Sequence, residues 1–315
     1  MKKIFITRNL PSIASTILQK YFVVHINKTN KPLPHQHLIE MVHDYNAILS
    51  TVSDKFTKEV LRKSNKLEVI SNYAAGLDNI DVEFAKYKNV SVYNTPDVVT
   101  NSTADLTFAL LLSLIRKISF ANEFVRQDKW KYWDPDLFLG EELNDKVFGI
   151  LGFGKIGQAV AKRAIGFGLN VIYNDPFVNK INLTLEPHVK QVSFDELLKQ
   201  SDYISIHISL TTETKRMINT NTISKMKKQP VLLNLARGEV IDTDDLVNAL
   251  KKGMIKGAAL DVTLPEPVPG NHPLCNIENC LIVPHIGTAT HECRYAMAKV
   301  SAINIVKHFL GSNER

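Results

Sequence analysis

The sequence contains few cysteines. There are three, Cys275, Cys280 and Cys293, and no two of them form a CxxC pair. A small and odd number argues against a disulfide framework and favours a reducing compartment. The spacing of Cys275 and Cys280 also lacks the paired pattern of zinc ligands, so we expect no metal site.

Long apolar runs are missing as well. The longest, Phe108 to Ile115, is far below the roughly 18 residues needed to cross a bilayer. Near the start, only Ile4 to Ile6 form an apolar run, which is too short for the core of a signal peptide. We therefore expect a cytoplasmic protein with no membrane partner.

A strong excess of one charge is the third absence. Lys plus Arg is 38 and Asp plus Glu is 32, which gives a net charge of +6. Apolar residues make up 44% and charged residues 22%, which is typical of a globular protein and excludes wholesale disorder. The small surplus does not indicate nucleic acid as a partner, but it leaves positive potential for an anionic small substrate.

What is present is a repeated alternation of short apolar runs with amphipathic stretches, over a length of about two domains. In the first hundred residues the apolar runs are 3–6, 22–26, 47–50, 67–70 and 90–93. The rhythm restarts at Val147, with runs at 147–151, 171–173, 203–206, 231–235, 258–262 and 281–283. This pattern predicts an α/β fold of two doubly wound parallel-sheet domains, Rossmann-like or flavodoxin-like, with a cleft between them.

Two other segments depart from this rhythm. Asn101 or Ser102 is expected to cap a helix whose apolar residues, 104–115, fall on nearly every face. Such a helix should be buried between domains or subunits, which favours a homodimer. The aromatic-rich segment 130–140 is expected to be an irregular loop. Beyond the last strand, residues 291–310 are expected to form a final helix.

The run from Val147 to Gly157 predicts a phosphate-binding turn. A strand leads into GxGxxG, formed by Gly152, Gly154 and Gly157, and a helix follows. The first glycine permits the tight turn, the second lets the backbone approach a pyrophosphate, and the third allows close packing of helix on strand. Free N–H groups at the start of the helix would bind the phosphate charge.

Asp175, at the end of the next strand, bears on the choice of cofactor. A carboxylate there accepts hydrogen bonds from a ribose 2′-hydroxyl and repels a 2′-phosphate. No arginine follows within ten positions, and Lys180 is the only nearby cation. The sequence therefore favours NAD over NADP.

Three polar residues follow other predicted strands. They are Arg237, Asp261 and His285, and each falls at the carboxyl end of its strand. In an open parallel sheet these ends share one edge with the glycine turn, and ligands bind outside that edge. Pro265 and Pro267 constrain the backbone on both sides of Glu266, which lies between two of these strands.

Taken together, the motifs resemble the D-isomer-specific 2-hydroxyacid dehydrogenase family, and within it the glyoxylate/hydroxypyruvate reductase-like branch. The resemblance spans about residues 70 to 300 and rests on runs 72–81, 94–100, 147–157, 234–242, 260–267 and 284–290. It implies reversible hydride transfer between NAD(H) and a small 2-oxo acid or its D-2-hydroxy acid.

The resemblance also implies a catalytic set of Arg237, Glu266 and His285. A guanidinium can hold substrate oxygens with several donors, and histidine is the side chain whose ordinary pKa lies near working pH. Glu266 would orient the imidazole and favour its protonated form. In the reductive direction His285 is the acid, and in the oxidative direction the base.

Further site residues come from the same resemblance. The backbone N–H groups of Ala75 and Gly76 would hold the substrate carboxylate, together with Arg237. Expected contacts to the cofactor are Thr103, Gly152, Gly154, Lys155, Ile156, Gly157, Asp175, His207, Ala236, Asp261 and Gly287. Residues 1–100 and 286–315 would form the substrate-binding domain and residues 101–285 the NAD-binding domain.

Two alternatives remain within the resemblance. One is an enzyme similar to D-3-phosphoglycerate dehydrogenase, and the other is an NAD(H)-sensing binding protein of the corepressor type. The chain also departs from the reductase branch, which often uses NADP and carries Ser-Arg near the position of Asp175. The preferred 2-oxo acid depends on pocket shape at the methylene level, which the sequence leaves open.

Overall fold

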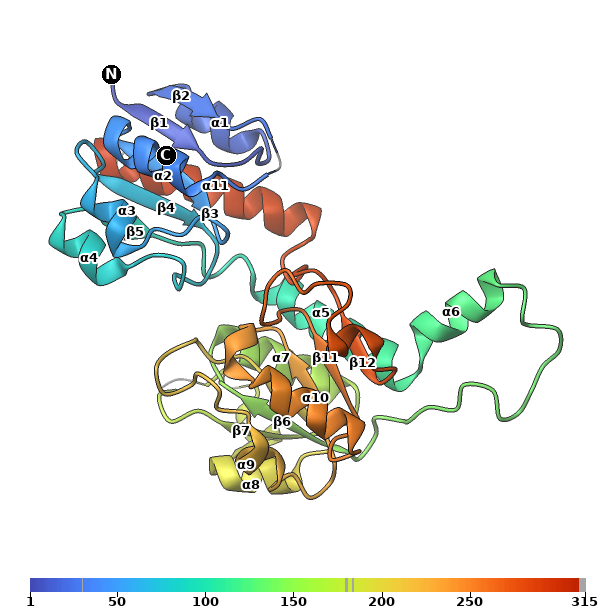
Figure 1. Cartoon of the computed structure of the whole chain (residues 1–315). Coiled ribbons are helices and arrows are strands. Elements are labelled where there is room, and N and C mark those ends of the chain that lie inside the picture. Colours follow the sequence, from blue (N-terminus) through green and yellow to red (C-terminus); the bar gives the residue numbers. More distant parts are fainter. Residues whose placement is uncertain (30, 179–180, 183, 312–315) are drawn as a thin grey trace. The chain divides into compact units, whose positions relative to one another are not determined.

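In the computed structural model the described residues are 1–29, 31–178, 181–182 and 184–311. Lys180, the cation near Asp175 in the sequence, lies outside them. The chain divides into two compact units, Met1–Val99 with Thr288–Arg315, and Thr100–Gly287. Each unit is built on one parallel sheet (Figure 1).

The first unit contains a five-stranded sheet in the order β2-β1-β3-β4-β5. Every pairing in it is parallel. The strands are β1 (Lys3–Ile6), β2 (Val23–Ile26), β3 (Ala47–Thr51), β4 (Val69–Tyr73) and β5 (Ser91–Tyr93). This is the flavodoxin-like order, in which the chain reverses direction across the sheet between β1 and β3.

Helices cover both faces of this sheet. The helices are α1 (Ile13–Leu18), α2 (His35–Asp44), α3 (Lys58–Arg62), α4 (Val82–Tyr87) and α11 (His291–Leu310). Leu38 of α2 and Val60 of α3 pack with Ile48 and Ile70 in one apolar core. On the other face α11 lies against α1 and β4, and Ser71 Oγ donates a 2.9 Å hydrogen bond to the Ser301 carbonyl. The end of the chain therefore completes the first unit.

The second unit contains a seven-stranded parallel sheet in the order β12-β11-β10-β9-β6-β7-β8. Its strands are β6 (Val147–Leu151), β7 (Asn170–Asn174), β8 (Val189–Gln191), β9 (Tyr203–Ile206), β10 (Val231–Asn234), β11 (Gly257–Leu260) and β12 (Cys280–Ile282). The chain reverses direction between β6 and β9, as in a Rossmann fold. The predicted fold class of two parallel α/β sheets is confirmed, although the short strand β8 was not predicted.

Alternating side chains place a core on each face of the second sheet. Ile204, Leu232 and Ala258 belong to one core, and their neighbours Leu233 and Ala259 belong to the other. The helices that flank the sheet are α5 (Thr100–Ile115), α7 (Lys155–Gly166), α8 (Phe194–Gln200), α9 (Thr220–Ile223) and α10 (Thr243–Lys251). Single 3₁₀ turns occur at Glu186–His188, Gly238–Val240 and Pro273–Asn276.

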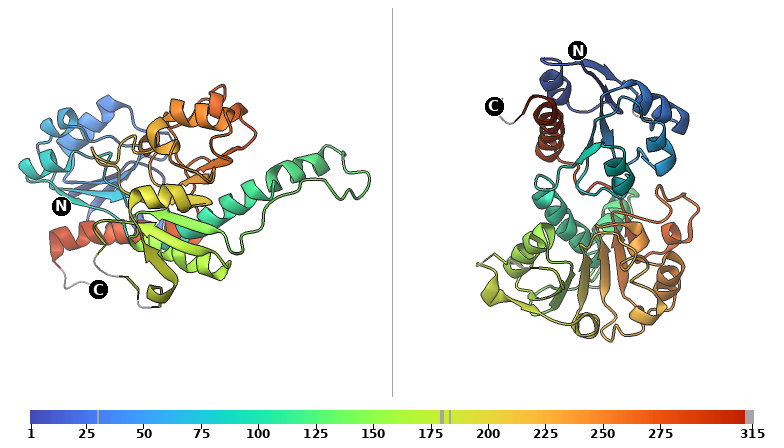
Figure 2. Two further views of the ribbon diagram at one scale, coloured as in Figure 1. Left: turned by 90° about the horizontal axis from the view of Figure 1, so that it is seen from below. Right: turned by 90° about the vertical axis from the view of Figure 1, so that its left-hand side faces the viewer.

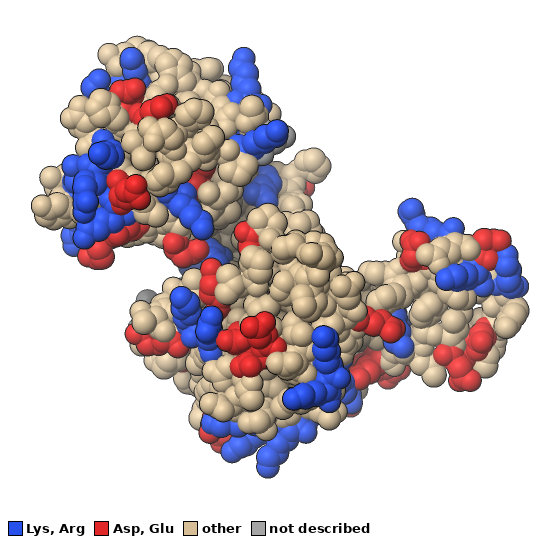
Figure 3. Space-filling model, viewed as in Figure 1, with Lys and Arg blue, Asp and Glu red and all other residues tan. Residues whose placement is uncertain are grey.

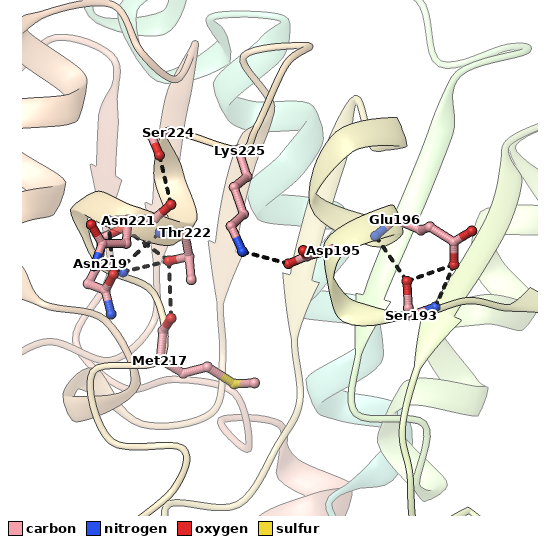
Figure 4. Close-up of polar contacts among 9 residues, drawn as sticks. All are labelled: Ser193, Asp195, Glu196, Met217, Asn219, Asn221, Thr222, Ser224 and Lys225. Atoms are coloured by element: carbon pink, nitrogen blue, oxygen red, sulfur yellow. Dashed lines mark hydrogen bonds and ion pairs between the residues drawn. The ribbon is translucent and has the colours of Figure 1, made fainter.

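Two helices on one side of this unit carry reciprocal caps (Figure 4). Ser193 Oγ accepts from the Glu196 N–H, while the Glu196 carboxylate accepts from the Ser193 N–H at 2.9 Å. Asn219 and Thr222 make the same exchange at α9. These contacts satisfy N–H groups that a helix start otherwise leaves without partners.

Helix α5 differs from expectation at both its start and its surroundings. It begins at Thr100, so neither Asn101 nor Ser102 caps it, and the Ser102 hydroxyl instead donates to the Gly287 carbonyl at 2.5 Å. Phe108 and Leu111 pack into the core of the second unit itself, beside α7. These side chains of α5 are therefore covered within their own unit and are not by themselves evidence of a subunit interface.

After α5 the chain forms an arm. Helix α6 (Ile118–Arg126) contains no buried residue, and 130–140 is irregular as predicted. Figures 1 and 2 show the arm standing away from the rest of the second unit. Trp133 is 79% exposed and Tyr132 is 74% exposed. The arm thus presents large apolar side chains that its own unit leaves uncovered.

Basic and acidic side chains are intermixed on the surface. On the face drawn in Figure 3, lysine and arginine lie beside aspartate and glutamate over both units and the arm. None of the helices in the described part of the chain is both long enough and apolar enough to cross a membrane. Within the same residues there is no group of three or more His, Cys, Asp or Glu placed to hold a metal ion.

Candidate active site

The carboxyl ends of the second sheet bring the predicted site residues to one edge. The glycine turn follows β6, His207 follows β9, Arg237 follows β10 shortly after its end, Asp261 follows β11, and His285 follows β12. The turn and His207 lie at the two strands between which the chain reverses direction. This is the position at which open parallel sheets bind their ligands.

Each glycine of the turn meets a different steric demand. Gly152 has φ +91°, a conformation that other residues rarely adopt, and a Cβ there would lie 2.7 Å from the His207 carbonyl. At Gly157 a Cβ would lie 2.2 Å from the Gly152 carbonyl oxygen, so only glycine lets α7 pack this closely. Around Gly154 a Cβ would meet nothing within 4 Å. Gly154 therefore keeps open the space in front of the first N–H groups of α7.

Asp175 follows β7 and is tied to the same turn. Its Oδ2 accepts a 2.7 Å hydrogen bond from the Phe153 N–H, and its Oδ1 accepts one of 2.8 Å from the Phe177 N–H. A carboxylate has about four acceptor positions, so these two bonds leave capacity for hydroxyl donors. The half-buried carboxylate is thus held beside the glycine turn in a fixed orientation.

His207 is held in a neutral state. Burial lowers its pKa to about 3, and its Nε2 lies 2.7 Å from Ser205 Oγ. Its Nδ1 is buried and has no hydrogen-bond partner among the described residues. A buried polar atom without a partner is costly, so this nitrogen marks a position that a polar ligand group would satisfy.

His285 and Glu266 form the closest pair of titratable groups at this edge. Nδ1 of His285 lies 2.7 Å from Oε1 of Glu266, across 19 residues of chain. Partial burial raises the pKa of Glu266, but the hydrogen bond and charge of His285, with smaller effects of Thr263 and Arg237, outweigh it and hold that pKa below its usual 4.5. Glu266 is therefore a carboxylate at neutral pH and the pair is charge-assisted.

Arg237 lies in the turn between β10 and the 3₁₀ turn Gly238–Val240. Its Nη1 donates to the Ala236 carbonyl at 2.7 Å, and its own carbonyl accepts from Asn234 Nδ2 at 2.9 Å. The next residue, Gly238, packs so closely on the turn before Glu266 that a Cβ would lie 2.1 Å from the Thr263 carbonyl oxygen. This contact, which was not predicted, joins the Arg237 turn to the Glu266 turn.

Asp261 supports the segment that carries His285. Its Oδ1 accepts from the Ile286 N–H at 2.6 Å and its Oδ2 from the Gly287 N–H at 2.9 Å. Burial raises the pKa of Asp261, although these two amides and the charge of His285 oppose the rise. Asp261 thus orients the 285–287 segment, and with about four acceptor positions its carboxylate keeps capacity for a further donor.

Comparison with known proteins identifies the family to which this chain belongs. The family model for the NAD-binding domain of D-isomer-specific 2-hydroxyacid dehydrogenases matches residues 108–287. The glyoxylate reductase of Thermococcus litoralis is 44% identical over 308 residues, which cover 96% of this chain and 92% of that protein. The chain belongs to the D-isomer-specific 2-hydroxyacid dehydrogenase family. It is thus an oxidoreductase whose second unit binds a nicotinamide dinucleotide.

Solved structures also agree with this chain in fold over nearly its whole length. The TT0316 protein of Thermus thermophilus is 38% identical with a TM-score of 0.91, covering 98% of this chain and 97% of that one. An NADPH-dependent glyoxylate/hydroxypyruvate reductase from Sinorhizobium meliloti, solved with NADP and malonate, is 26% identical. Its TM-score is 0.84, and the match covers 98% of this chain and 94% of that one.

The residues present fit the dinucleotide that such a domain binds. The open space over Gly154 leaves room for a pyrophosphate at the start of α7, a helix of 12 residues. Asp175 offers a carboxylate beside that turn, and His207 Nδ1 offers a buried polar atom without a partner among the described residues. The glycine turn, Asp175 and His207 are therefore the parts of this site that would hold the dinucleotide.

The remaining predicted cofactor residues of the second unit lie around the same edge. Lys155 and Ile156 begin α7, and the Ala236 N–H donates to Asn234 Oδ1 at 3.1 Å. Thr103 lies in α5 with its hydroxyl 3.5 Å from the Gly287 carbonyl. This contact ties the start of α5 to the segment that follows His285.

Ala75 and Gly76 belong to the first unit. They follow β4 in a partly exposed turn, and neither backbone N–H has a hydrogen-bond partner among the described residues. Buried polar side chains, including Asn72 and Asp54, lie beneath this turn. The sequence motif identified the turn, but the side chains that hold it were not predicted.

Proposed function

We propose that this protein is an NAD(H)-dependent reductase that converts a small 2-oxo acid, such as glyoxylate or hydroxypyruvate, to its D-2-hydroxy acid. The observation that carries the proposal is the 2.7 Å contact between His285 and Glu266, with Arg237 close enough to act on the charge of Glu266. The name of the Thermococcus litoralis relative supports the same substrate class.

The roles of the three side chains follow from their contacts. Because Nδ1 of His285 is engaged by Glu266, Nε2 is the nitrogen left to give a proton to the substrate oxygen. The hydrogen bond to the Glu266 carboxylate fixes the orientation of the ring. Arg237 supplies a fork of donors for the carbonyl and carboxylate oxygens of the substrate. When bound, the dinucleotide would supply a hydride for the carbonyl carbon, and His285 would give the proton that completes the alcohol.

Asp175 is the reason for proposing NAD over NADP. Its carboxylate is held in place by the Phe153 N–H, so it does not turn away easily from an approaching 2′-phosphate. A fixed like charge at close range opposes binding by several kcal/mol. In the same proposal residues 101–285 bind NAD, while residues 1–100 and 286–315 contribute substrate-binding groups.

A turnover assay tests the proposed function. NADH and NADPH oxidation would be followed with glyoxylate, hydroxypyruvate, pyruvate and 3-phosphohydroxypyruvate. Fastest turnover of the first two with NADH supports the proposal, and preference for the phosphorylated substrate favours an enzyme similar to D-3-phosphoglycerate dehydrogenase. Tight NADH binding with no turnover of any 2-oxo acid would identify an NAD(H)-sensing binding protein instead.

A homodimer is part of the same proposal. The exposed side chains of the arm lie next to a cavity of about 480 Å³, lined in part by Leu114, Phe120 and Leu139. Large exposed apolar groups on a projecting segment mark a protein interface, and a second copy of the chain would cover them. Trp133→Ser should shift the sedimentation coefficient toward that of a monomer. Phe177→Ser, which removes another exposed aromatic side chain outside the arm, is the matched control.

A further inference from the structure

The turn at residues 74–77 of the first unit has an ordered arrangement of carbonyl groups. The Ala74 carbonyl accepts from the Thr95 N–H at 2.8 Å. The Ala75 carbonyl accepts from Asn94 Nδ2 at 2.6 Å, and the Gly76 carbonyl accepts from Asn72 Nδ2 at 3.0 Å. Three successive peptide groups are thus each held by their oxygen.

Holding the oxygen of a peptide group also sets the direction of its N–H. In a planar trans peptide the N–H points away from the carbonyl of the same group. The three carbonyls therefore direct the N–H groups of Ala75, Gly76 and Leu77 to the opposite sides of their peptides. None of these three N–H groups has a hydrogen-bond partner among the described residues. The turn consequently presents three donors to a ligand.

The two asparagines are themselves held in place. Asn72 is fully buried, and its Nδ2 also donates to Asn79 Oδ1 at 2.9 Å. Its Oδ1 lies 3.0 Å from Ser50 Oγ, so the direction of the amide is set on both sides. The backbone carbonyl of Asn94 accepts from Asn304 Nδ2 of α11 at 3.2 Å. Asn72, on β4, and Asn94, just after β5, are therefore both held in position by other residues of the unit.

We propose that Asn94 and Asn72 are positioning residues for substrate binding, and that Leu77 contributes a third N–H donor beside those of Ala75 and Gly76. Asn94 directs the Gly76 N–H, and Asn72 directs the Leu77 N–H. Backbone donors fixed before the ligand arrives hold a carboxylate at little cost in ordering. This inference rests on the proposed function, because it takes the 2-oxo acid carboxylate as the group that is bound.

Asn94 is the residue to test first, because it is only half-buried and its replacement leaves the core of the unit intact. Asn94→Ala and the size-matched Asn94→Leu both remove the donor to the Ala75 carbonyl. We expect KM for glyoxylate to rise roughly tenfold to a hundredfold. The Gly76 N–H would no longer be directed at the substrate carboxylate, and its hydrogen bond to that charged group would be lost. The inhibition constant of oxamate, a 2-oxo acid analogue that is not reduced, should rise by the same factor.

Two readouts separate positioning from a general structural effect. At saturating glyoxylate kcat should stay within about threefold of the parent, because binding is lost equally in ground and transition states. The Kd for NADH should be unchanged. Asn46→Ala is the matched control, since Asn46 Nδ2 also donates to a backbone carbonyl of the same unit, that of Lys66. Asn46 precedes β3, at the opposite edge of the parallel sheet from the turn that follows β4.

Each outcome decides the inference. A KM and an oxamate inhibition constant within twofold of the parent in both Asn94 variants would overturn it. A parallel loss of kcat, NADH affinity and thermal stability would overturn it too, by showing a structural role. If the parent enzyme reduces no 2-oxo acid and binds no oxamate, the proposed function fails and the inference with it. If the parent is active and only the variants are unaffected, the inference alone fails.

Discussion

The backbone N–H of Phe153 donates a 2.7 Å hydrogen bond to Oδ2 of Asp175. Phe153 lies inside the glycine turn, between Gly152 and Gly154, while Asp175 follows the neighbouring strand. Asp175, which we expect to discriminate between NAD and NADP, is therefore hydrogen-bonded to the turn that we expect to bind their pyrophosphate. Asp175 therefore contributes both its charge and this hydrogen bond.

Asp175→Asn separates these two effects, because asparagine keeps an oxygen acceptor for the Phe153 N–H and loses the charge. We expect the ratio of kcat/KM for NADPH to that for NADH to rise roughly tenfold or more, since repulsion of the 2′-phosphate is removed. Asp175→Ser should raise the same ratio but weaken both dinucleotides through the loosened turn. An unchanged ratio in both variants would refute the charge argument.

Gly154→Ala and Gly157→Ala form a second matched pair. A Cβ at Gly154 meets nothing within 4 Å, so this variant should keep the parent melting temperature and lose NADH affinity by roughly tenfold or more, because the methyl group occupies the phosphate space. A Cβ at Gly157 would lie 2.2 Å from the Gly152 carbonyl oxygen, so this variant should be destabilised by several kcal/mol. Calorimetry and NADH titration check both. Normal cofactor affinity in Gly154→Ala would contradict the phosphate assignment.

His285→Ala should abolish proton transfer and leave the dinucleotide site intact. We expect kcat for glyoxylate reduction to fall by roughly 10²–10⁴-fold, the usual contribution of a positioned acid. NADH affinity, measured by fluorescence titration, should stay within about twofold. A loss of affinity as large as the loss of rate would show that His285 serves the cofactor site and not the reacting oxygen.

Glu266→Gln should slow reduction and change the pH dependence of stability. Glutamine keeps an oxygen for Nδ1 of His285 but loses the charge of the pair, so kcat/KM should fall roughly tenfold or more. The pKa of Glu266 is lowered in the fold, so its contribution to stability is complete above its unfolded value near 4.5 and is lost as pH falls through the lower folded value. The difference in melting temperature between parent and variant should therefore persist at about pH 5 and disappear in stronger acid. An unchanged kcat/KM together with an unchanged melting temperature at neutral pH would argue against a functional contact between Glu266 and His285.

Ser193→Ala tests the reciprocal cap of α8 shown in Figure 4. Loss of the cap should lower the free energy of unfolding by about 1 kcal/mol without changing kcat/KM, because α8 lies away from the glycine turn in sequence and carries no site residue. Urea unfolding gives the free energy. Thr212→Ala, at an exposed threonine whose side chain makes no hydrogen bond to the described residues, is the control and should be neutral.

Much of the architecture could be predicted because it depends on local patterns. Period-two and period-3.6 alternation located most strands and helices, and the run from Gly152 to Gly157 defined the turn. The start of α5 was placed wrongly because Ser102, a good capping residue, is engaged by the Gly287 carbonyl. β8 was missed because Val189–Gln191 is short and mostly polar, and only its pairing with β7 makes it a strand.

The sequence by itself determined the alternation of strands and helices, the glycine turn and the acidic residue after it, since neighbouring residues alone specify these features. Only the tertiary structure decided that Glu266 meets His285, that Gly238 packs on Thr263, and that Asn94 and Asn72 hold the carbonyls of one turn. Those contacts join residues on different strands and loops. They depend on the order of strands in each sheet and on how closely the chain packs, which no local pattern encodes.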